Sequence, residues 1–545
     1  MTAEFTGFVH RVGREVHDGT GRPLLMRGFG LGNWLLPEGY MWKFVEPGPT
    51  APRGIEALFA DLVGEERAAQ FWTAFRDTYI TGDDIARMAA LGADHVRLPI
   101  NARVVWTDEG EPIEAGFALV DRLIDWCRLY GLWVVLDLHG APGGQTGKNI
   151  DDSLGTPALF EEERYRRLTL DLWRYIAVRY RDETVVAAYD LLNEPLPEEY
   201  QYSYADRLVA MYKDLTAVIR EVDQNHLLMY EGSHWATNFT GFELWDENSL
   251  LQFHGYWQPP DRAWIRPYLE VGERLGLPLY MGEGGENNPD WILTAFTMYE
   301  DHGIGWNFWP WKKIDTLSSP CSVEAPEGWW DIVAFASGTG PRPDSEAAWA
   351  TLSELIPRFD VARCRWRPEV VSALLKTAPV RIPAWGFGFE GPGVSYRTGG
   401  ARPLAGFRAD EQVTILADKS EDGKPNFHHI WGEARDPSDH LHLRLEAGDW
   451  VEYRFVLTQP GPVHVTVSYQ TAAQAPEVLL DGIATEHIAT EYVSVVVDPA
   501  ASAAAAPGGT WSYVSPAALP AGDHRLRLLA TADATVVDHL DVRTA

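Results

Sequence analysis

Eight short apolar runs, separated by longer segments of helical periodicity, restrict the fold of this chain more than any other sequence feature. Strands separated by helices pair in parallel, and strands that are apolar along nearly their whole length are buried on both faces. Eight such units in succession predict a (β/α)8 TIM barrel. The predicted strands are Leu24–Gly32, His95–Ile100, Leu132–Gly140, Val185–Pro195, His226–Gly232, Leu250–Tyr256, Pro278–Gly285 and Gly303–Trp311. The predicted helices between them include Asp83–Leu91, Ala118–Tyr130, Glu162–Tyr180, Ala205–Val222 and Trp264–Leu275.

The pattern changes after Trp385, where apolar and polar residues begin to alternate with a period of two. Strands at this spacing, without intervening helices, are typical of an antiparallel β-sandwich. A chain of 545 residues is also too long for one hydrophobic core. We therefore predict two domains: a barrel with its closing helices over residues 1–383, and a jelly-roll-like sandwich over residues 384–545. The alternating segments are Asp449–Leu457, Val463–Tyr469, Glu477–Leu480 and His524–Ala530.

Polar side chains gather at the ends of the predicted barrel strands. In TIM barrels the chemistry takes place at the carboxyl ends of the strands, whereas polar residues at strand starts serve only solvation. The clustering therefore predicts an active site at this end of the barrel. The residues concerned are Arg97, His139, Asn193, Glu194, His254, Tyr256, Glu283 and Trp309.

Two of these residues, Glu194 and Glu283, end the fourth and seventh predicted strands, on opposite sides of the barrel mouth. Hydrolysis of a glycosidic bond with retention needs one carboxylic acid to protonate the leaving oxygen and one carboxylate to attack the anomeric carbon. We predict that Glu194 is the acid/base and Glu283 the nucleophile. The alternative is a pair of structural carboxylates in a barrel without activity.

The neighbouring residues suit this chemistry. Arg97 and Tyr256 are expected to hold the nucleophile ionised. Asn193 is expected to bond the sugar 2-hydroxyl, a contact that strengthens in the transition state. His139 and His254 are expected to bond sugar hydroxyls or tune Glu194, or else to be satisfied core histidines. Trp309 is expected to form the apolar floor under the sugar ring.

Six motifs in order, RLPI, DLHGAPG, LLNEP, HGY, MGEGG and WNFWPW, resemble glycoside hydrolase family 5 of clan A between Leu24 and Lys312. The segments GLGNWLLPEGY and DLHGAPGGQTGKN resemble the exo-β-1,3-glucanase branch. That resemblance implies that Glu38 grips the non-reducing terminal sugar and that no cofactor or metal is needed. The chain departs from the family at Gly282–Gly285, where Gly-Glu-Gly-Gly replaces Gly-Glu-Phe-Gly, which leaves any subsite contact of that aromatic in doubt.

The C-terminal segments GDWVEYRF, VLLDG and LPAGDHRLRL resemble carbohydrate-binding modules of the family 6 and family 35 type. Sugar binding there would require exposed loop aromatics such as Trp431 or Trp511; the alternative is a sandwich that only packs against the barrel. A metal site in this region would need four converging ligands, and the spacing of its histidines favours ordinary exposed side chains instead. These histidines are His428, His429, His440 and His442.

The net charge of −32, from 46 basic and 78 acidic residues, makes nucleic acid and anionic membranes poor partners. The first residues contain no apolar core of a signal peptide, and the three cysteines are too sparse for a disulfide framework, so a cytoplasmic location is expected, with secretion left open. The sequence thus favours a retaining β-glycosidase, exo-acting on small glycosides or oligosaccharides. An endo-β-glucanase or mannanase, and a non-catalytic carbohydrate-binding protein, remain as alternatives; the oligomeric state is not predicted.

Overall fold

The computed structural model describes residues 5–400, 406–418, 425–484, 486–492 and 508–544. The chain divides into two compact units. The first contains residues 1–256, 268–285 and 303–366, and the second contains residues 257–267, 286–302 and 367–545. The predicted boundary at residues 383 and 384 thus falls inside the second unit. None of the helices in the described part of the chain is long and apolar enough to cross a lipid bilayer.

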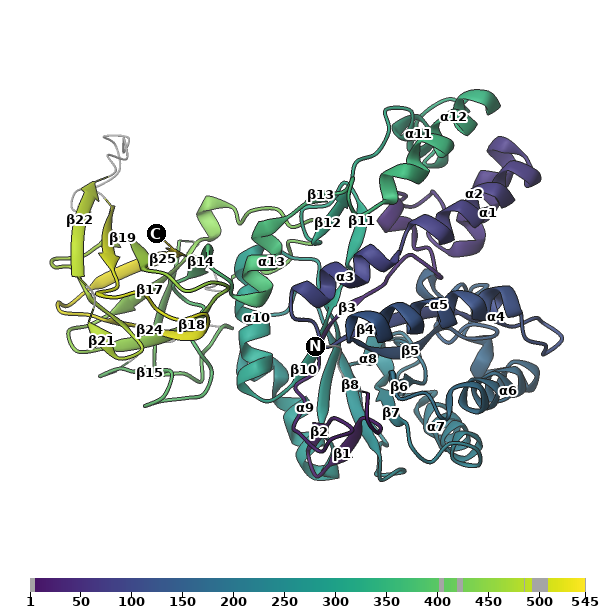
Figure 1. Cartoon of the computed structure of the whole chain (residues 1–545), viewed down its shortest axis with the longest axis horizontal. Helices are drawn as coiled ribbons and strands as arrows, with labels where there is room; N and C mark the ends of the chain where they lie inside the picture. Colours follow the sequence, from purple (N-terminus) through teal and green to yellow (C-terminus); the bar gives the residue numbers. More distant parts are fainter. Residues whose placement is uncertain (1–4, 401–405, 419–424, 485, 493–507, 545) are drawn as a thin grey trace. The chain divides into compact units, whose positions relative to one another are not determined.

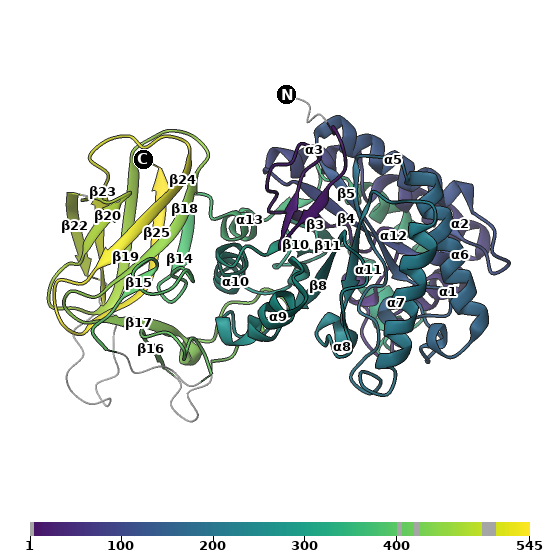
Figure 2. The same ribbon diagram turned by 90° about the horizontal axis from the view of Figure 1, so that it is seen from below.

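The first unit is built around a closed barrel of eight parallel strands, which confirms the predicted fold (Figures 1 and 2). All the strands except the first residues of β3 and β5 are buried along their length, as expected for strands covered on both faces. In order around the barrel they are β10 (Gly305–Trp309), β3 (Arg27–Gly30), β4 (His95–Asn101), β5 (Trp133–Gly140), β6 (Val186–Asp190), β7 (Leu227–Glu231), β8 (Ser249–Gly255) and β9 (Leu279–Gly285).

Helices follow the strands along the chain and lie around the barrel (Figure 2). Local signals in the sequence set their ends. The Thr81 and Asp84 side chains form a capping box at the start of α3. The helix α5 ends at Gly131, which adopts the left-handed conformation with φ 81°. These helices are α3 (Gly82–Ala90), α5 (Glu114–Tyr130), α6 (Glu163–Tyr180), α7 (Ala205–Arg220) and α9 (Arg262–Leu275), the last of which is shared between the two units.

The remaining elements of the first unit are shorter or lie in the connections. They are β1 (His10–Val12), β2 (Glu15–His17), η1 (Gly39–Trp42), α1 (Pro52–Val63), α2 (Glu65–Thr78), α4 (Ala102–Val105), η2 (Asn149–Asp151), η3 (Ala158–Phe160), α8 (Ser233–Ala236), β11 (Lys312–Ile314), β12 (Cys321–Val323), α11 (Trp329–Ala336), α12 (Ser345–Leu355), η4 (Ile356–Phe359) and β13 (Arg365–Trp366).

The second unit contains two antiparallel sheets, as predicted for the C-terminal region. Alternate residues of β19, among them Val463, Val465 and Val467, are buried, which is the period-two pattern seen in the sequence. One sheet contains β14 (Val380–Pro383), β16 (Thr414–Ala417), β17 (Leu441–Leu445), β19 (Val463–Thr471), β22 (Glu486–Tyr492), β23 (Gly509–Val514) and β25 (Thr535–Thr544). The other contains β15 (Tyr396–Arg397), β18 (Trp450–Leu457), β20 (Glu477–Leu480), β21 (Ile483–Ala484) and β24 (Gly522–Leu529), and the unit also has α10 (Pro289–Asp301), α13 (Pro368–Leu375) and η5 (Pro437–Asp439).

Two expectations for the sandwich were wrong. Trp511 is not an exposed loop aromatic, because it lies in β23, is 4% exposed and stacks on Tyr469 at 3.7 Å. Trp431 is exposed, as expected. His429 and His442 are buried rather than exposed. The ring of His442 is held by hydrogen bonds to the carboxylates of Asp538 and Asp418, at 2.6 and 3.0 Å.

A buried lysine lies just beyond the end of β10. Lys312 Nζ is fully buried, forms an ion pair with Asp84 Oδ1 at 2.7 Å, and donates to the carbonyl oxygens of Tyr79 and Phe359 at 2.7 and 2.8 Å. The same carboxylate oxygen accepts the indole N–H of Trp311 at 2.8 Å. Lys312 therefore ties the start of α3 to the chain that follows the last barrel strand.

We predict that Lys312→Ala lowers the free energy of unfolding by about 3–5 kcal/mol, because it leaves the buried Asp84 carboxylate without its cation. Urea denaturation followed by circular dichroism measures the change. Lys213 is a suitable control, since it is half exposed and lies 3.8 Å from the exposed Glu243. The Lys213→Ala variant is expected to change the same quantity by less than about 1 kcal/mol. Equal effects of the two substitutions would contradict the prediction.

Candidate active site

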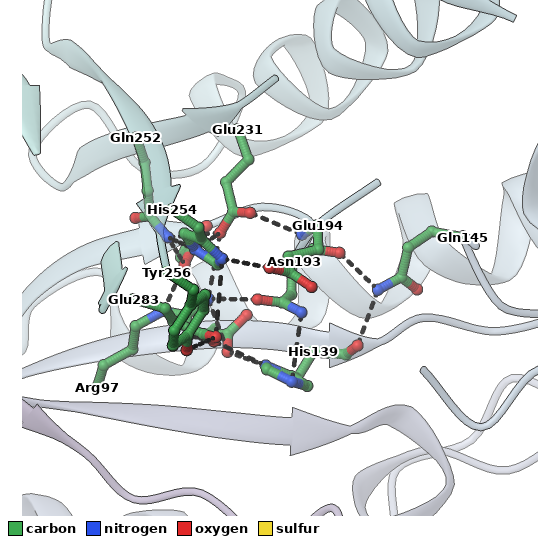
Figure 3. A network of polar contacts seen from close by, with 12 residues as sticks. Arg97, His139, Gln145, Asn193, Glu194, Glu231, Gln252, His254, Tyr256 and Glu283 are labelled. Atoms are coloured by element: carbon green, nitrogen blue, oxygen red, sulfur yellow. Dashed lines mark hydrogen bonds and ion pairs between the residues drawn. The ribbon is translucent and has the colours of Figure 1, made fainter. Parts of the chain in front are cut away.

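The structure brings the predicted site residues together at the carboxyl end of the barrel. Figure 3 shows Arg97, His139, Asn193, Glu194, His254, Tyr256 and Glu283 in one network of polar contacts. Arg97 comes from β4, His139 from β5, His254 from β8 and Glu283 from β9. The other three follow the ends of β6 and β8. The seven residues thus gather at the carboxyl ends of the strands, where the sequence pattern predicted them. Their individual roles remain predictions.

Glu283 is held by two donors. Arg97 Nη1 donates to Glu283 Oε1 at 2.5 Å, and the Tyr256 hydroxyl donates to Glu283 Oε2 at 3.0 Å. Only 5% of the Glu283 side chain is exposed. Both bonds require a carboxylate oxygen as acceptor, and the one from Arg97 is charge-assisted. This is the environment that a nucleophilic carboxylate needs, and it matches the expectation for Arg97 and Tyr256.

Glu194 lies in the loop after β6 rather than on the strand itself, because β6 ends at Asp190. Its backbone has φ 42°, in the left-handed region that disfavours residues with a Cβ. The Glu194 amide donates to Glu231 Oε2 at 2.6 Å, a contact that offsets this strain. On the side chain, His254 Nδ1 donates to Glu194 Oε1 at 2.8 Å.

The distance between the carboxyl groups of Glu194 and Glu283 indicates whether hydrolysis would retain or invert the anomeric configuration. One carboxylate oxygen of Glu194, one of Glu283 and one ring nitrogen of His254 lie within 4.8 Å of one another. Retaining glycosidases hold their carboxyl groups about 5–5.5 Å apart, whereas inverting enzymes leave about 6.5–9.5 Å for a water molecule. The short separation suits direct attack by one carboxylate, with retention.

These three groups are also the only cluster of possible metal ligands in the described part of the chain. A metal ion requires a neutral imidazole. Burial alone would lower the pKa of His254, but the nearby carboxylates of Glu231 and Glu283 and the hydrogen bond to Glu194 raise it well above its usual value. His254 is therefore a protonated ring whose two nitrogens face carboxylates, and this donor set does not fit a metal.

His139 is bound differently from His254. Burial is the largest influence on its ring and lowers its pKa to about 4, so the ring is neutral. Its Nδ1–H donates to Asp137 Oδ2 at 2.8 Å, and its Nε2 accepts from Asn193 Nδ2 at 3.3 Å. Gln145, which sequence reasoning missed, donates to the backbone oxygens of both His139 and Asn193, at 2.8 and 2.9 Å. These bonds fix Asn193 beside Glu194.

Trp309 stacks on His139 with ring centroids 5.5 Å apart and an interplanar angle of 8°. Its indole N–H donates to the Tyr40 hydroxyl at 2.9 Å. Two glycines near the end of β3 make room for the ring, because a Cβ on Gly30 or Gly32 would come within 2.5 or 2.7 Å of Trp309 atoms. The position of this indole thus explains the glycines at positions 30 and 32.

Glu38 lies outside this network, in the loop before η1. It is buried, and its backbone N–H donates to Asn33 Oδ1 at 3.3 Å. Its expected contact with a terminal sugar remains a prediction.

Four carboxylates surround the fully buried Arg97 guanidinium, and sequence reasoning identified only one of them. The distances from its nitrogens are 3.1 Å to Asp137, 2.8 Å to Asp190, 3.1 Å to Glu231 and 2.5 Å to Glu283. Burial opposes the charge on Arg97, but these carboxylates outweigh it and raise the pKa of the guanidinium well above its usual value. Arg97 is therefore a permanent cation at the centre of the site.

The three missed acids, Asp137, Asp190 and Glu231, lie at or near the ends of β5, β6 and β7. Burial raises the pKa of Asp137 to about 7, and it also raises the pKa values of Asp190 and Glu231. The signal that could have revealed them is an acidic residue within an otherwise apolar strand, as in VVLDL, AAYD and LLMYE. A buried acid is costly unless it is paired, so each such residue indicates a partner nearby.

Residues 62–315 match the model of the family described as Cellulase (glycosyl hydrolase family 5). This segment of the chain is therefore similar to family 5. A β-xylosidase of Phanerodontia chrysosporium is 34% identical over 251 residues, 45% of this chain and 51% of the relative. A probable glucan 1,3-β-glucosidase A of Emericella nidulans is 30% identical over 260 residues, 46% of this chain and 62% of the relative. Endoglucanase C of Acetivibrio thermocellus is 26% identical over 306 residues, 44% of this chain and 86% of the relative.

The chain therefore spans about half the length of the β-xylosidase that it matches. These relatives match less than half of the chain, and the segment that matches the family model contains every predicted site residue except Glu38. The likeness of the C-terminal sandwich to carbohydrate-binding modules remains a prediction.

Proposed function

We propose that this protein is a retaining β-glycosidase that hydrolyses O-glycosidic bonds by double displacement. The observation that carries the proposal is the pair Glu194 and Glu283, with carboxylate oxygens within 4.8 Å of each other at the end of the barrel. In the first step, Glu283 attacks the anomeric carbon while Glu194 gives its proton to the departing oxygen. In the second, Glu194 takes a proton from water, the water oxygen attacks the anomeric carbon, and the bond to Glu283 breaks.

The neighbouring groups assist both steps. Arg97 and Tyr256 donate to Glu283 and stabilise the charge that it carries before attack and regains on departure. Asn193 Oδ1 accepts from Arg97 at 2.8 Å, which orients the Asn193 amide beside Glu194. Its Nδ2 retains a second hydrogen for the sugar 2-hydroxyl. Trp309 provides an apolar ring face for the bound sugar.

An exo-acting enzyme on small glycosides or oligosaccharides is the specific form of the proposal. It is supported by the buried Glu38 in the loop before η1 and by the names of two relatives, a β-xylosidase and a glucan 1,3-β-glucosidase. The relative named endoglucanase C supports an endo-acting alternative. A non-catalytic carbohydrate-binding protein is the alternative of another class.

We predict that Glu283→Ala abolishes hydrolysis of a panel of aryl β-glycosides. Glu194→Ala should lower kcat/KM by about 10²–10⁴-fold for 4-nitrophenyl glycosides but much less for 2,4-dinitrophenyl glycosides, which need little protonation. Added azide should restore turnover of the Glu194→Ala variant and give a β-glycosyl azide. The exposed Glu198, in the same loop, is the control, and Glu198→Gln should keep the wild-type rate.

Proton NMR of the first-formed anomer provides an independent readout. A β-configured product is expected, and an α-configured product would exclude Glu283 as nucleophile. Absence of hydrolysis by the wild type across glucosides, xylosides, galactosides and mannosides would favour the non-catalytic alternative.

The exo form is tested separately with unlabelled β-linked oligosaccharides. A single sugar released from the non-reducing end is expected, whereas early products of mixed length would show endo action. The Glu38→Ala variant should lose about 10- to 100-fold in kcat/KM on these substrates, as expected for loss of a charged hydrogen bond to a terminal hydroxyl. An unchanged kcat/KM in this variant would contradict the assignment of Glu38.

A further inference from the structure

Glu231, at the end of β7, contacts both halves of the site. Its Oε2 accepts the backbone N–H of Glu194 at 2.6 Å. Its Oε1 lies 3.3 Å from His254 Nε2 and 3.1 Å from Arg97 Nη2. The side chain is completely buried. Glu231 therefore contacts the residue that holds Glu194 and the residue that holds Glu283.

His254 joins two of these carboxylates. Its Nδ1 donates to Glu194 Oε1 at 2.8 Å, while its Nε2 faces Glu231 Oε1. A neutral imidazole has one N–H and can satisfy only one of the two oxygens, whereas a protonated ring donates to both. The arrangement of acceptors on opposite sides of the ring thus selects the cation.

We propose that Glu231 is a positioning residue, which acts through His254 and through the backbone amide of Glu194 to orient the acid/base carboxyl and to govern when that carboxyl holds its proton. This inference rests on the proposed role of Glu194. Glu231 itself does not face the reacting bond, because both of its oxygens are occupied by the protein.

The first route of action is geometric. Glu194 has a left-handed backbone with φ 42°, and Leu196, two residues later, has φ 62°. Such a backbone persists only where neighbouring contacts hold it. The bond from the Glu194 amide to Glu231 is such a contact, and its loss would let the acid/base side chain move away from the sugar oxygen.

The second route is electrostatic. Burial disfavours the charge on His254, and Glu231 is the leading group that counters this effect and raises its pKa. Removal of the negative charge at Glu231 therefore lowers the pKa of His254, and the ring becomes neutral. Glu194 then loses the cation beside its Oε1, and a cation next to a carboxyl group favours the ionised form of that group. The other charged or titratable groups that act on the ring include Glu194, Glu283, Asp137 and His139.

The test compares Glu231→Gln with the wild type in the pH dependence of kcat/KM on 4-nitrophenyl and 2,4-dinitrophenyl β-glycosides. We expect kcat/KM for the 4-nitrophenyl substrate to fall at least about tenfold, with a smaller loss for the 2,4-dinitrophenyl substrate. The pH at which kcat/KM declines on the alkaline side of the profile should increase by about one pH unit. The proposal would be overturned if kcat/KM fell equally for both substrates with no change in the pH of the alkaline decline. It would also be overturned if that decline shifted to lower pH.

Asp190→Asn is the matched control. Asp190 is equally buried and carries the same charge, but its Oδ2 bonds Arg97 at 2.8 Å and Gln252 at 2.9 Å instead of the Glu194 amide and His254. This variant tests general damage to the buried charge cluster, and its alkaline decline should stay at the wild-type pH. An alkaline decline shifted equally in both variants would also overturn the proposal.

Nitrogen-15 NMR of labelled histidine, with the His254 signal assigned by its absence in His254→Gln, needs neither turnover nor a stable Glu231 variant. The wild-type His254 ring is expected to stay doubly protonated well above pH 6.5, the ordinary value for histidine, and titration at or below 6.5 would overturn the coupling. If the wild type hydrolyses no glycoside but His254 stays protonated, the proposed function fails and the coupling stands. If the wild type hydrolyses glycosides and His254 titrates at its ordinary value, the proposed function stands and the coupling between Glu231 and His254 fails.

Discussion

The guanidinium of Arg97 is the interaction on which the rest of the site depends. It is buried without any contact with solvent and is bound by carboxylates from the ends of four other strands, β5, β6, β7 and β9. Removing a charge from water costs several kcal/mol, and only close partners of opposite sign offset that cost. A shift in the register of any of these strands would leave either a carboxylate or the guanidinium without its partner, so the cluster constrains the alignment of the strands around it.

The same cluster makes the two predicted catalytic carboxyl groups unlike each other. Glu283 is bonded directly to the permanent cation and to a tyrosine hydroxyl. Glu194 is bonded to a histidine, whose charge depends on further carboxylates. A retaining hydrolase needs one group that stays ionised and another that exchanges its proton in each cycle. The difference in partners provides that division of roles without any difference in residue type.

The sequence sufficed to predict the barrel and the position of most site residues, because both follow from simple periodicities. A strand buried on both faces is apolar, and its polar end residue then stands out, as His139 and Glu283 do. The acids Asp137, Asp190 and Glu231 were missed because they pair with a residue from another strand, and such pairing depends on the closure of the barrel. Trp511 was misjudged for a related reason, since only the folded sheet shows that Tyr469 covers it.

The two carboxyl groups also differ in how they are attached to the scaffold. Glu283 lies within β9, where hydrogen bonds to β8 and β10 fix its backbone. Glu194 lies in a loop beyond the barrel sheet, and a few side-chain bonds from Glu231 and His254 hold it there. Thermal motion or a loop substitution would therefore change the distance between the two groups mainly by moving Glu194. Under the proposed mechanism, a change in this loop would alter the delivery of the proton to the leaving group, while the barrel would keep the Glu283 carboxylate in place.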